Sequence, residues 1–322
     1  MRTLIRLGIL LSLGQSFALG SDIRIQRADD HLLVETDALA VRINTKGYVS
    51  GTAAGGLLDK KTGARDAGFG LHIMDFLLAP GRRDDGYMNE KVHGKIEKHY
   101  VEGPQVCTRA RELKPEIVQG KDFVAIRFQF TFTKPGQGYK AGSTWEQTLV
   151  FQNGLRYFLS AEEITPVNDV NSLFYRIDMP GHIKHKNGDS FEKIWLSYER
   201  DIPATDFAND FAPDEKHLYQ RQAGRIPERM IRAYQVKLHG RPGPWLAGMT
   251  LDPSAVSEAW CHQRGYVCFI QELHARPVKP GEKFGAAYVV GWFDSKDDMT
   301  ATYDKFKGKS RIVMTPDAFE LK

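Results

Sequence analysis

Hydrophobic and polar residues alternate along most of this chain. The clearest run is 123–133, where apolar side chains fall on one side and polar side chains on the other: Ile126, Phe128, Phe130 and Phe132 against Arg127, Gln129, Thr131 and Thr133. A period of two residues is typical of a β-strand with one buried face and one wet face. The sequence therefore predicts a strand here.

Shorter runs of the same kind follow one another, separated by turn residues such as Asn153-Gly154 and Lys279-Pro280-Gly281. They are 32–36, 39–43, 144–151, 156–161, 173–178, 194–198, 230–236, 245–251, 266–271 and 283–293. So many short strands indicate a mainly β protein, a large antiparallel β-sandwich or a barrel.

One short C-terminal helix is predicted at about 295–307. Ser295 can cap its start with Asp298 at the capping-box position, and Gly308 can end it. Met299, Tyr303 and Phe306 give the apolar stripe of a helix. Because no repeat or linker-like stretch interrupts the chain, we expect 21–322 to form a single β-sandwich domain.

The first twenty residues have the pattern of a signal peptide. Arg2 and Arg6 precede an apolar run that ends in Ala18-Leu19-Gly20. The run is too short for a membrane span, and no later stretch is long enough, so we expect a periplasmic or secreted protein with no membrane partner after cleavage.

The charge balance excludes nucleic acid as the main partner. The 44 basic residues, less Arg2 and Arg6, face 40 acidic ones, so the processed chain has a net charge of about +2. Local basic patches remain possible, which permits an acidic ligand.

Three cysteines remain for the exported chain: Cys107, Cys261 and Cys268. Because Cys261 and Cys268 lie seven apart across a predicted turn, they can form a disulfide across a hairpin; two buried thiols are the alternative. The chain has no two Cys-x-x-Cys pairs, so the sequence indicates no structural zinc, and we expect no metal and no cofactor.

The segment 260–268 concentrates the side chains that bind sugars. His262 can transfer a proton, Arg264 can clamp a carboxylate, and Trp260 can stack on a pyranose ring. The alternative is a turn held by the disulfide, with Arg264 in a surface ion pair.

Other candidates are spread along the chain. His182 stands three residues before His185, as a general base, as half of a weak metal motif, or in a solvated turn. Arg82 and Arg83 can hold an anionic sugar beside Tyr87, or can simply balance the charges of the acids that follow them.

His99 and Gln105 belong to a polar segment that is either a binding strand or an edge strand facing water. Tyr198 ends a predicted strand, where it can donate or accept a proton or can serve as a core ring.

The segment 278–288 resembles the closing strand of galactose-mutarotase-like proteins, in which a Pro-Gly-Glu turn, here Pro280-Gly281-Glu282, precedes a strand with aromatic residues. The paired strands predicted at 32–43, followed by Leu57-Leu58-Asp59, are similar to the opening of that family. The resemblance implies a β-supersandwich with a sugar-binding sheet and a carboxylate shortly before the turn. Glu272 is the nearest acid, but 273–277 lacks the family's Asn/Pro-rich loop, which puts simple mutarotation in doubt.

These residues together favour a polysaccharide lyase that performs β-elimination on a uronic-acid-containing glycan. In this hypothesis His262 and Tyr198 exchange protons while Arg264 holds the carboxylate. The alternatives are an aldose epimerase that uses His182 or His262 with Glu272, a glycoside hydrolase, and a noncatalytic glycan-binding module. The expected partner is an acidic polysaccharide or oligosaccharide.

Overall fold

The computed structural model describes residues 23–49, 51–53, 55–71, 73–84, 93–185, 190–212 and 215–322. The predicted signal peptide lies outside the described residues, as does Tyr87. Among the described residues, no helix is both long and apolar enough to cross a bilayer.

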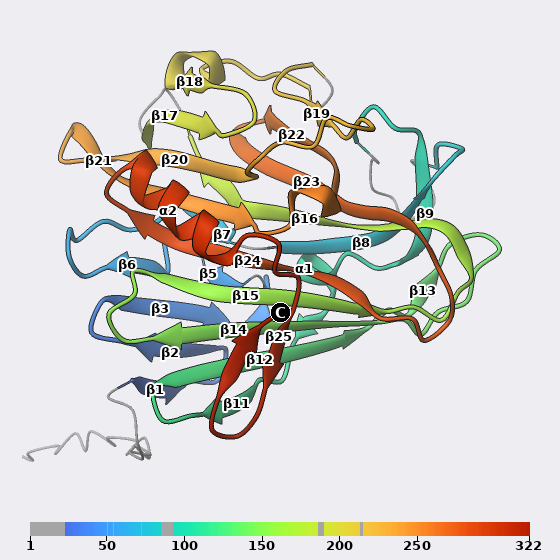
Figure 1. The fold of residues 1–322 in the computed structure, drawn as a ribbon, viewed down its shortest axis with the longest axis horizontal. Helices are drawn as coiled ribbons and strands as arrows, with labels where there is room; N and C mark the ends of the chain where they lie inside the picture. Colours follow the sequence, from blue (N-terminus) through green and yellow to red (C-terminus); the bar gives the residue numbers. More distant parts are fainter. Residues whose placement is uncertain are drawn as a thin grey trace, which may run out of the picture.

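Two large antiparallel sheets form most of the molecule (Figure 1). Sheet I has the order β11 (Glu116–Gln119), β12 (Phe123–Thr131), β14 (Thr144–Gln152), β15 (Tyr157–Thr165), β24 (Phe284–Phe293), β21 (Arg241–Thr250), β20 (Ile231–Leu238), β17 (Phe191–Leu196) and β18 (Asp201–Pro203). Sheet II has the order β13 (Lys134–Pro135), β9 (Lys98–Gly103), β8 (Ile73–Pro80), β16 (Val170–Lys184), β23 (Tyr266–Val278), β22 (Val256–Gln263) and β19 (Tyr219–Gln220), with β7 (Gly68–Leu71) on β16 and β5 (Thr52–Ala53) on β7.

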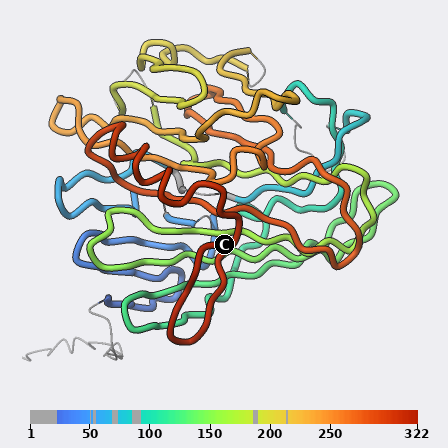
Figure 2. Tube along the Cα trace, in the orientation of Figure 1, coloured from blue at the N-terminus to red at the C-terminus, as the bar shows by residue number. Residues whose placement is uncertain are grey.

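Smaller elements complete the sandwich. The first strands, blue in Figure 2, form a four-stranded sheet of β1 (Arg24–Arg27), β2 (His31–Glu35), β3 (Leu39–Asn44) and β6 (Leu57–Asp59), whose inner side chains join the main core. The remaining elements are β4 (Lys46–Gly47) paired with β10 (Arg111–Glu112), α1 (Val106–Arg109), η1 (Ala204–Phe207), η2 (Pro253–Ala255), α2 (Lys296–Phe306), and the hairpin of β25 (Ile312–Met314) and β26 (Phe319–Leu321).

One apolar core fills the space between sheets I and II. Within it, Tyr288 of β24 donates a hydrogen bond to Glu162 (3.2 Å), so Tyr175 of β16 donates the hydrogen bond that joins the two phenols (2.8 Å). Because all three side chains are buried, this chain of hydrogen bonds links the two sheets through their interior.

A second core covers the outer face of sheet I. There α2 and the C-terminal hairpin lie over the sheet (Figure 1). Met299, Tyr303 and Leu321 belong to the same buried cluster as Ala247 of β21. The part of sheet I under α2 and the hairpin is therefore buried on both faces, whereas the outer face of sheet II has buried polar side chains.

The structure confirms the mainly β antiparallel fold and the short C-terminal helix predicted from the sequence. Ser295 caps α2 by accepting a hydrogen bond from the Asp298 amide (3.1 Å). The segment 260–268 differs from the prediction, because β22 continues to Gln263 and the turn is confined to Arg264 and Gly265. The single-domain organisation stays a prediction.

Candidate functional site

The outer face of sheet II brings together residues from three neighbouring strands. His262 of β22 pairs with Cys268 of β23, and Cys268 pairs with His182 of β16. Residues directly opposite one another in antiparallel strands share a face of the sheet. These three side chains therefore form a row across the outer face.

A bulge in β16 adds Asp178 to this row. Asp178 pairs with Ile270 and His182 with Cys268, so 179–181 stand opposite Phe269 alone. Residues four apart in a regular strand are separated by roughly 13 Å. The bulge instead brings a carboxylate oxygen of Asp178 within 3.2 Å of Nε2 of His182.

Gly248 of β21 in sheet I makes room for this bulge. A Cβ at Gly248 would lie 2.7 Å from Cγ of Met179 and 2.9 Å from the nitrogen of Pro180. The close approach of the two sheets at this point therefore requires a glycine.

A second irregularity lies between β8 and β16. Tyr175 pairs with Leu77 and Ile177 with Met74, so Asp75 and Phe76 both stand opposite Arg176. Burial and the neighbouring charge of Asp178 raise the pKa of Asp75 to about 7. Gln105 donates a hydrogen bond to Asp75 (2.8 Å), which makes it a supporting residue of this face and removes it from the candidates that bind substrate directly.

Next to this row lies the ionic cluster, which consists of Lys98, Arg176, Glu258 and Glu272. Lys98 pairs with Glu258 (2.8 Å) and Glu272 (2.6 Å), and Arg176 pairs with Glu272 (2.6 Å). Both carboxylates are fully buried. Because each oxygen of Glu272 already has a cationic partner, Glu272 stabilises the fold and is not placed to transfer a proton to a sugar.

Trp260 belongs to the same buried region. Nζ of Lys98 lies 5.2 Å from the centroid of its ring, and the guanidinium of Arg176 lies 5.3 Å away. The indole is 0% exposed, so it cannot stack on a pyranose as the sequence suggested.

The histidine cluster consists of Asp178, His182, His262, Tyr266 and Cys268. The Tyr266 ring lies 5.0 Å from the His182 ring and 6.5 Å from the His262 ring, between centroids. His262 is 5% exposed, and neither of its ring nitrogens has a hydrogen-bond partner within the described part of the chain.

The imidazoles of this cluster have opposite pKa shifts. Burial lowers the pKa of His262 to about 4. Burial also opposes the charged form of His182, but the Asp178 carboxylate outweighs it and raises the pKa of His182 above 6.5. Burial raises the pKa of Tyr266 to about 12, so this phenol keeps its proton.

Arg264 lies at the end of the β22–β23 hairpin, where the cluster reaches the surface. It is exposed, and its charge acts on both His262 and Tyr266. The amide of Gly265 donates to a carboxylate oxygen of Asp210 (3.1 Å), which holds the turn in place.

Asp178, His182 and Cys268 form a group that could hold a metal ion. One donor atom of each lies within 4.8 Å of the others.

The predicted disulfide is wrong. Cys261 and Cys268 are free cysteines. Cys261 pairs with Phe269 and points into the core between the sheets, whereas Cys268 shares the outer face with His262. Successive strand residues point to opposite faces, so the two sulfurs are on opposite sides of sheet II.

Tyr198 does not join His262, which corrects the predicted proton exchange between them. It packs against the core between the sheets and contacts Tyr219, with ring centroids 5.4 Å apart. It therefore lies behind sheet II as seen from His262.

The remaining candidates gather elsewhere. His99 stacks on Tyr139 beside a cavity of about 470 Å³ that Asp169 and Lys279 also line. Arg82 is exposed, and its charge acts on His99. Arg83 is also exposed, and its guanidinium lies 3.4 Å from the Gly94 carbonyl oxygen.

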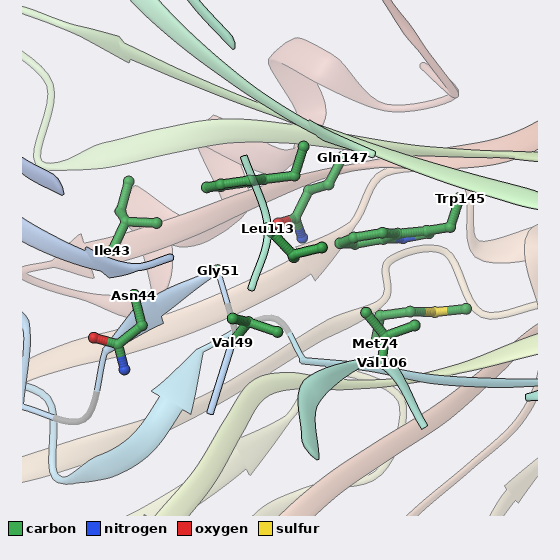
Figure 3. A pocket seen from close by; sticks show the side chains of 10 residues that line it. Ile43, Asn44, Val49, Gly51, Met74, Val106, Leu113, Trp145 and Gln147 are labelled. Atoms are coloured by element: carbon green, nitrogen blue, oxygen red, sulfur yellow. The ribbon is translucent and has the colours of Figure 1, made fainter. Parts of the chain in front are cut away.

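The pocket in Figure 3 is not a sugar site. Its lining is mainly apolar and includes Met74, Leu113 and Trp145. Its volume of about 10 Å³ admits roughly one water molecule.

Sequence reasoning missed Tyr266 and Asp178. The signal for Asp178 is Pro180-Gly181 directly after a predicted strand, because proline and glycine within a strand mark bulges. The signal for Tyr266 is its alternation with Cys268 and Ile270, which places the three on one face.

No family model and no curated protein matches this chain. Among solved structures it is similar to the 4-alpha-glucanotransferase of Thermococcus litoralis (9% identity, TM-score 0.43, covering 85% of this chain and 40% of that one). It is also similar to the galactose 1-epimerase of Lactobacillus acidophilus NCFM (10% identity, TM-score 0.40, covering 87% of this chain and 98% of that one). A third similar structure is the alpha-mannosidase of Enterococcus faecalis V583 (10% identity, TM-score 0.48, covering 85% of this chain and 30% of that one). At TM-scores below 0.5 and identities of 9–10%, these similarities assign no activity to this chain.

Proposed function

We propose that this chain is a carbohydrate-active enzyme that transfers protons at the histidine cluster, and that its reaction is β-elimination on a uronic-acid-containing glycan. The observation that carries the proposal is His262, a buried imidazole beside the Tyr266 phenol, neither of whose nitrogens has a hydrogen-bond partner among the residues that the structure describes. A buried polar group without a partner costs about 1–3 kcal/mol, and a ligand bound beside His262 would supply that partner.

The residues divide the reaction between them. His262 accepts the proton α to the substrate's carboxylate, and the electron pair of that C–H bond forms the C4–C5 double bond. The bond from C4 to the glycosidic oxygen breaks, and Tyr266 donates a proton to the leaving oxygen. Exchange of protons with water then restores both side chains.

Arg264 supports a substrate that has a carboxylate. The cations of the ionic cluster are buried and paired with glutamates, whereas Arg264 is exposed beside His262. A guanidinium binds a carboxylate with two parallel hydrogen bonds and stabilises the negative charge that develops during elimination.

Incubation with a panel of uronic-acid polymers tests the proposal, with the ultraviolet absorbance of an unsaturated product as the readout. We expect His262→Ala and Tyr266→Phe to lower kcat by about 10²–10⁴-fold. Arg264→Gln should mainly raise KM. Tyr198→Phe and Arg82→Gln, which change residues outside the cluster, should keep the rate of the unmodified protein.

Three outcomes would overturn the proposal in favour of another class. Reducing ends without an unsaturated product would establish hydrolysis. A change in optical rotation of a free sugar without bond cleavage would establish epimerisation. Glycan binding without turnover, unchanged by His262→Ala, would establish a binding module.

A further inference from the structure

The donor atoms of Asp178, His182 and Cys268 offer a second chemistry on the same face. We propose that these three residues bind a divalent transition-metal ion, with Zn²⁺ as the ion whose preferences they match. A carboxylate oxygen, an imidazole nitrogen and a sulfur within 4.8 Å of one another come from two adjacent strands.

The set of donors selects the class of metal. Zn²⁺ binds cysteine sulfur, histidine nitrogen and carboxylate oxygen, and three protein ligands leave a fourth position for water or substrate. Ca²⁺ and Mg²⁺ prefer oxygen ligands alone, so a site with sulfur and nitrogen does not suit them.

Unpaired buried atoms provide an independent observation. Asp178 is 2% exposed, and its Oδ1 has no hydrogen-bond partner among the described residues. The nearby cation Arg176 is engaged by Glu272. A metal ion would neutralise the Asp178 carboxylate and satisfy its free oxygen.

The surroundings also hold the ligands in place. Nδ1 of His182 lies 3.5 Å from the Tyr48 hydroxyl, which leaves Nε2 directed at Asp178. A hydrogen bond to the second ring nitrogen is the usual way in which proteins orient a metal-binding histidine. The bulge that brings Asp178 to His182 packs on Gly248, so the ligands have a rigid frame.

Binding of the ion goes beyond the proposed function, whereas the role of the ion rests on it. With the substrate's carboxylate in the fourth position, Zn²⁺ would stabilise the negative charge that develops when His262 takes the proton.

Titration of the metal-free full chain with Co²⁺, with no sugar present, tests the binding. We expect visible ligand-field bands and a near-ultraviolet thiolate-to-cobalt band, both lost when Zn²⁺ is added. Cys268→Ser should remove the near-ultraviolet band and weaken Co²⁺ binding by at least about 100-fold. Cys261→Ser is the matched control, because Cys261 is equally buried but lies on the opposite face of β22.

Absence of both bands in the unmodified protein would overturn the proposal, as would a near-ultraviolet band that survives in Cys268→Ser. If Cys268→Ser does not fold, the test uses the unmodified protein and Cys261→Ser. Both should show the cobalt bands if the proposal is right. Cobalt bands without elimination activity would leave the metal site standing and reject the lyase. Elimination by the metal-free protein, together with an absence of cobalt bands, would support the lyase and reject the metal site.

Discussion

The two outer faces of this sandwich solve the problem of burial in different ways. Sheet I is covered in part by α2 and the C-terminal hairpin, and its outer face is apolar where they pack on it. The outer face of sheet II instead buries the ionic cluster and the histidine cluster. Apolar burial stabilises in proportion to area, whereas every buried ion needs a partner. Burial on sheet I is therefore mainly apolar, whereas burial on sheet II places ionisable groups next to one another.

The largest effect is expected from Lys98→Met. Among the described residues, the substitution leaves Glu258 with no ion-pair partner and Glu272 with Arg176 alone. Loss of one partner from a buried ion pair costs about 3–5 kcal/mol in the free energy of unfolding, which urea denaturation measures. Lys279→Met, which removes the exposed pair with Asp169, should cost less than about 1 kcal/mol. Equal losses of stability for Lys98→Met and Lys279→Met would show that the buried ion pairs matter no more than an exposed one.

Met299→Ala probes the apolar face. Met299 of α2 is fully buried against sheet I, so its truncation should lower the free energy of unfolding by about 3 kcal/mol. Lys305→Ala on the exposed side of the same helix should change it by no more than about 0.5 kcal/mol. The turnover number should stay the same in both variants. A fall in turnover for Met299→Ala would show that packing on the outer face of sheet I affects the histidine cluster on sheet II.

The stability of the protein should depend on pH through a buried histidine of sheet II. His274 of β23 has a pKa lowered to about 4 by burial, and its Nε2 lies 2.9 Å from the Gly285 carbonyl oxygen. The unfolded chain binds this proton below about pH 6.5, but the folded chain does not until about pH 4. His274 alone should therefore lower the stability by up to about 3 kcal/mol between these two values as the pH falls. Thermal unfolding at a series of pH values measures this loss, and His274→Gln should show a smaller one.

Gly248→Ala should have the smallest effect on stability and a selective effect on the site. The new methyl group meets Met179 and Pro180, so we expect a loss of about 1–3 kcal/mol from overpacking. The displaced bulge should also weaken Co²⁺ binding, although no ligand has changed. Unchanged stability together with unchanged Co²⁺ affinity would show that the two sheets are not in tight contact here.

The sequence predicted the strands well because a period of two residues reports local burial. It also predicted α2, whose cap and apolar stripe are local signals. It named His262, Arg264 and His182 as candidates, and the structure places all three on or beside the outer face of sheet II, while their chemical roles stay predictions. It could not show which strands are neighbours, so Tyr198 was paired with His262 although Tyr266 is the phenol beside it.

The cysteines show the same limit. Seven residues of separation suit a hairpin disulfide, but the register of β22 and β23 puts the two sulfurs on opposite faces. The bulges at Asp75 and at 179–181 depend on pairing between strands distant in the chain. Such register shifts decide which side chains meet. A local pattern such as Pro180-Gly181 can mark a bulge, but it does not show which residues of another strand stand opposite it.

The hydrogen-bonded phenols of Tyr175 and Tyr288 constrain how this molecule can respond to a ligand. Any sliding of one sheet over the other would separate the two hydroxyl groups inside an apolar layer, where water cannot replace the lost partner. The sheets should therefore behave as a single stiff platform when a ligand binds. If the proposed reaction holds, adjustment to different glycan chains is left to the connecting segments around the platform.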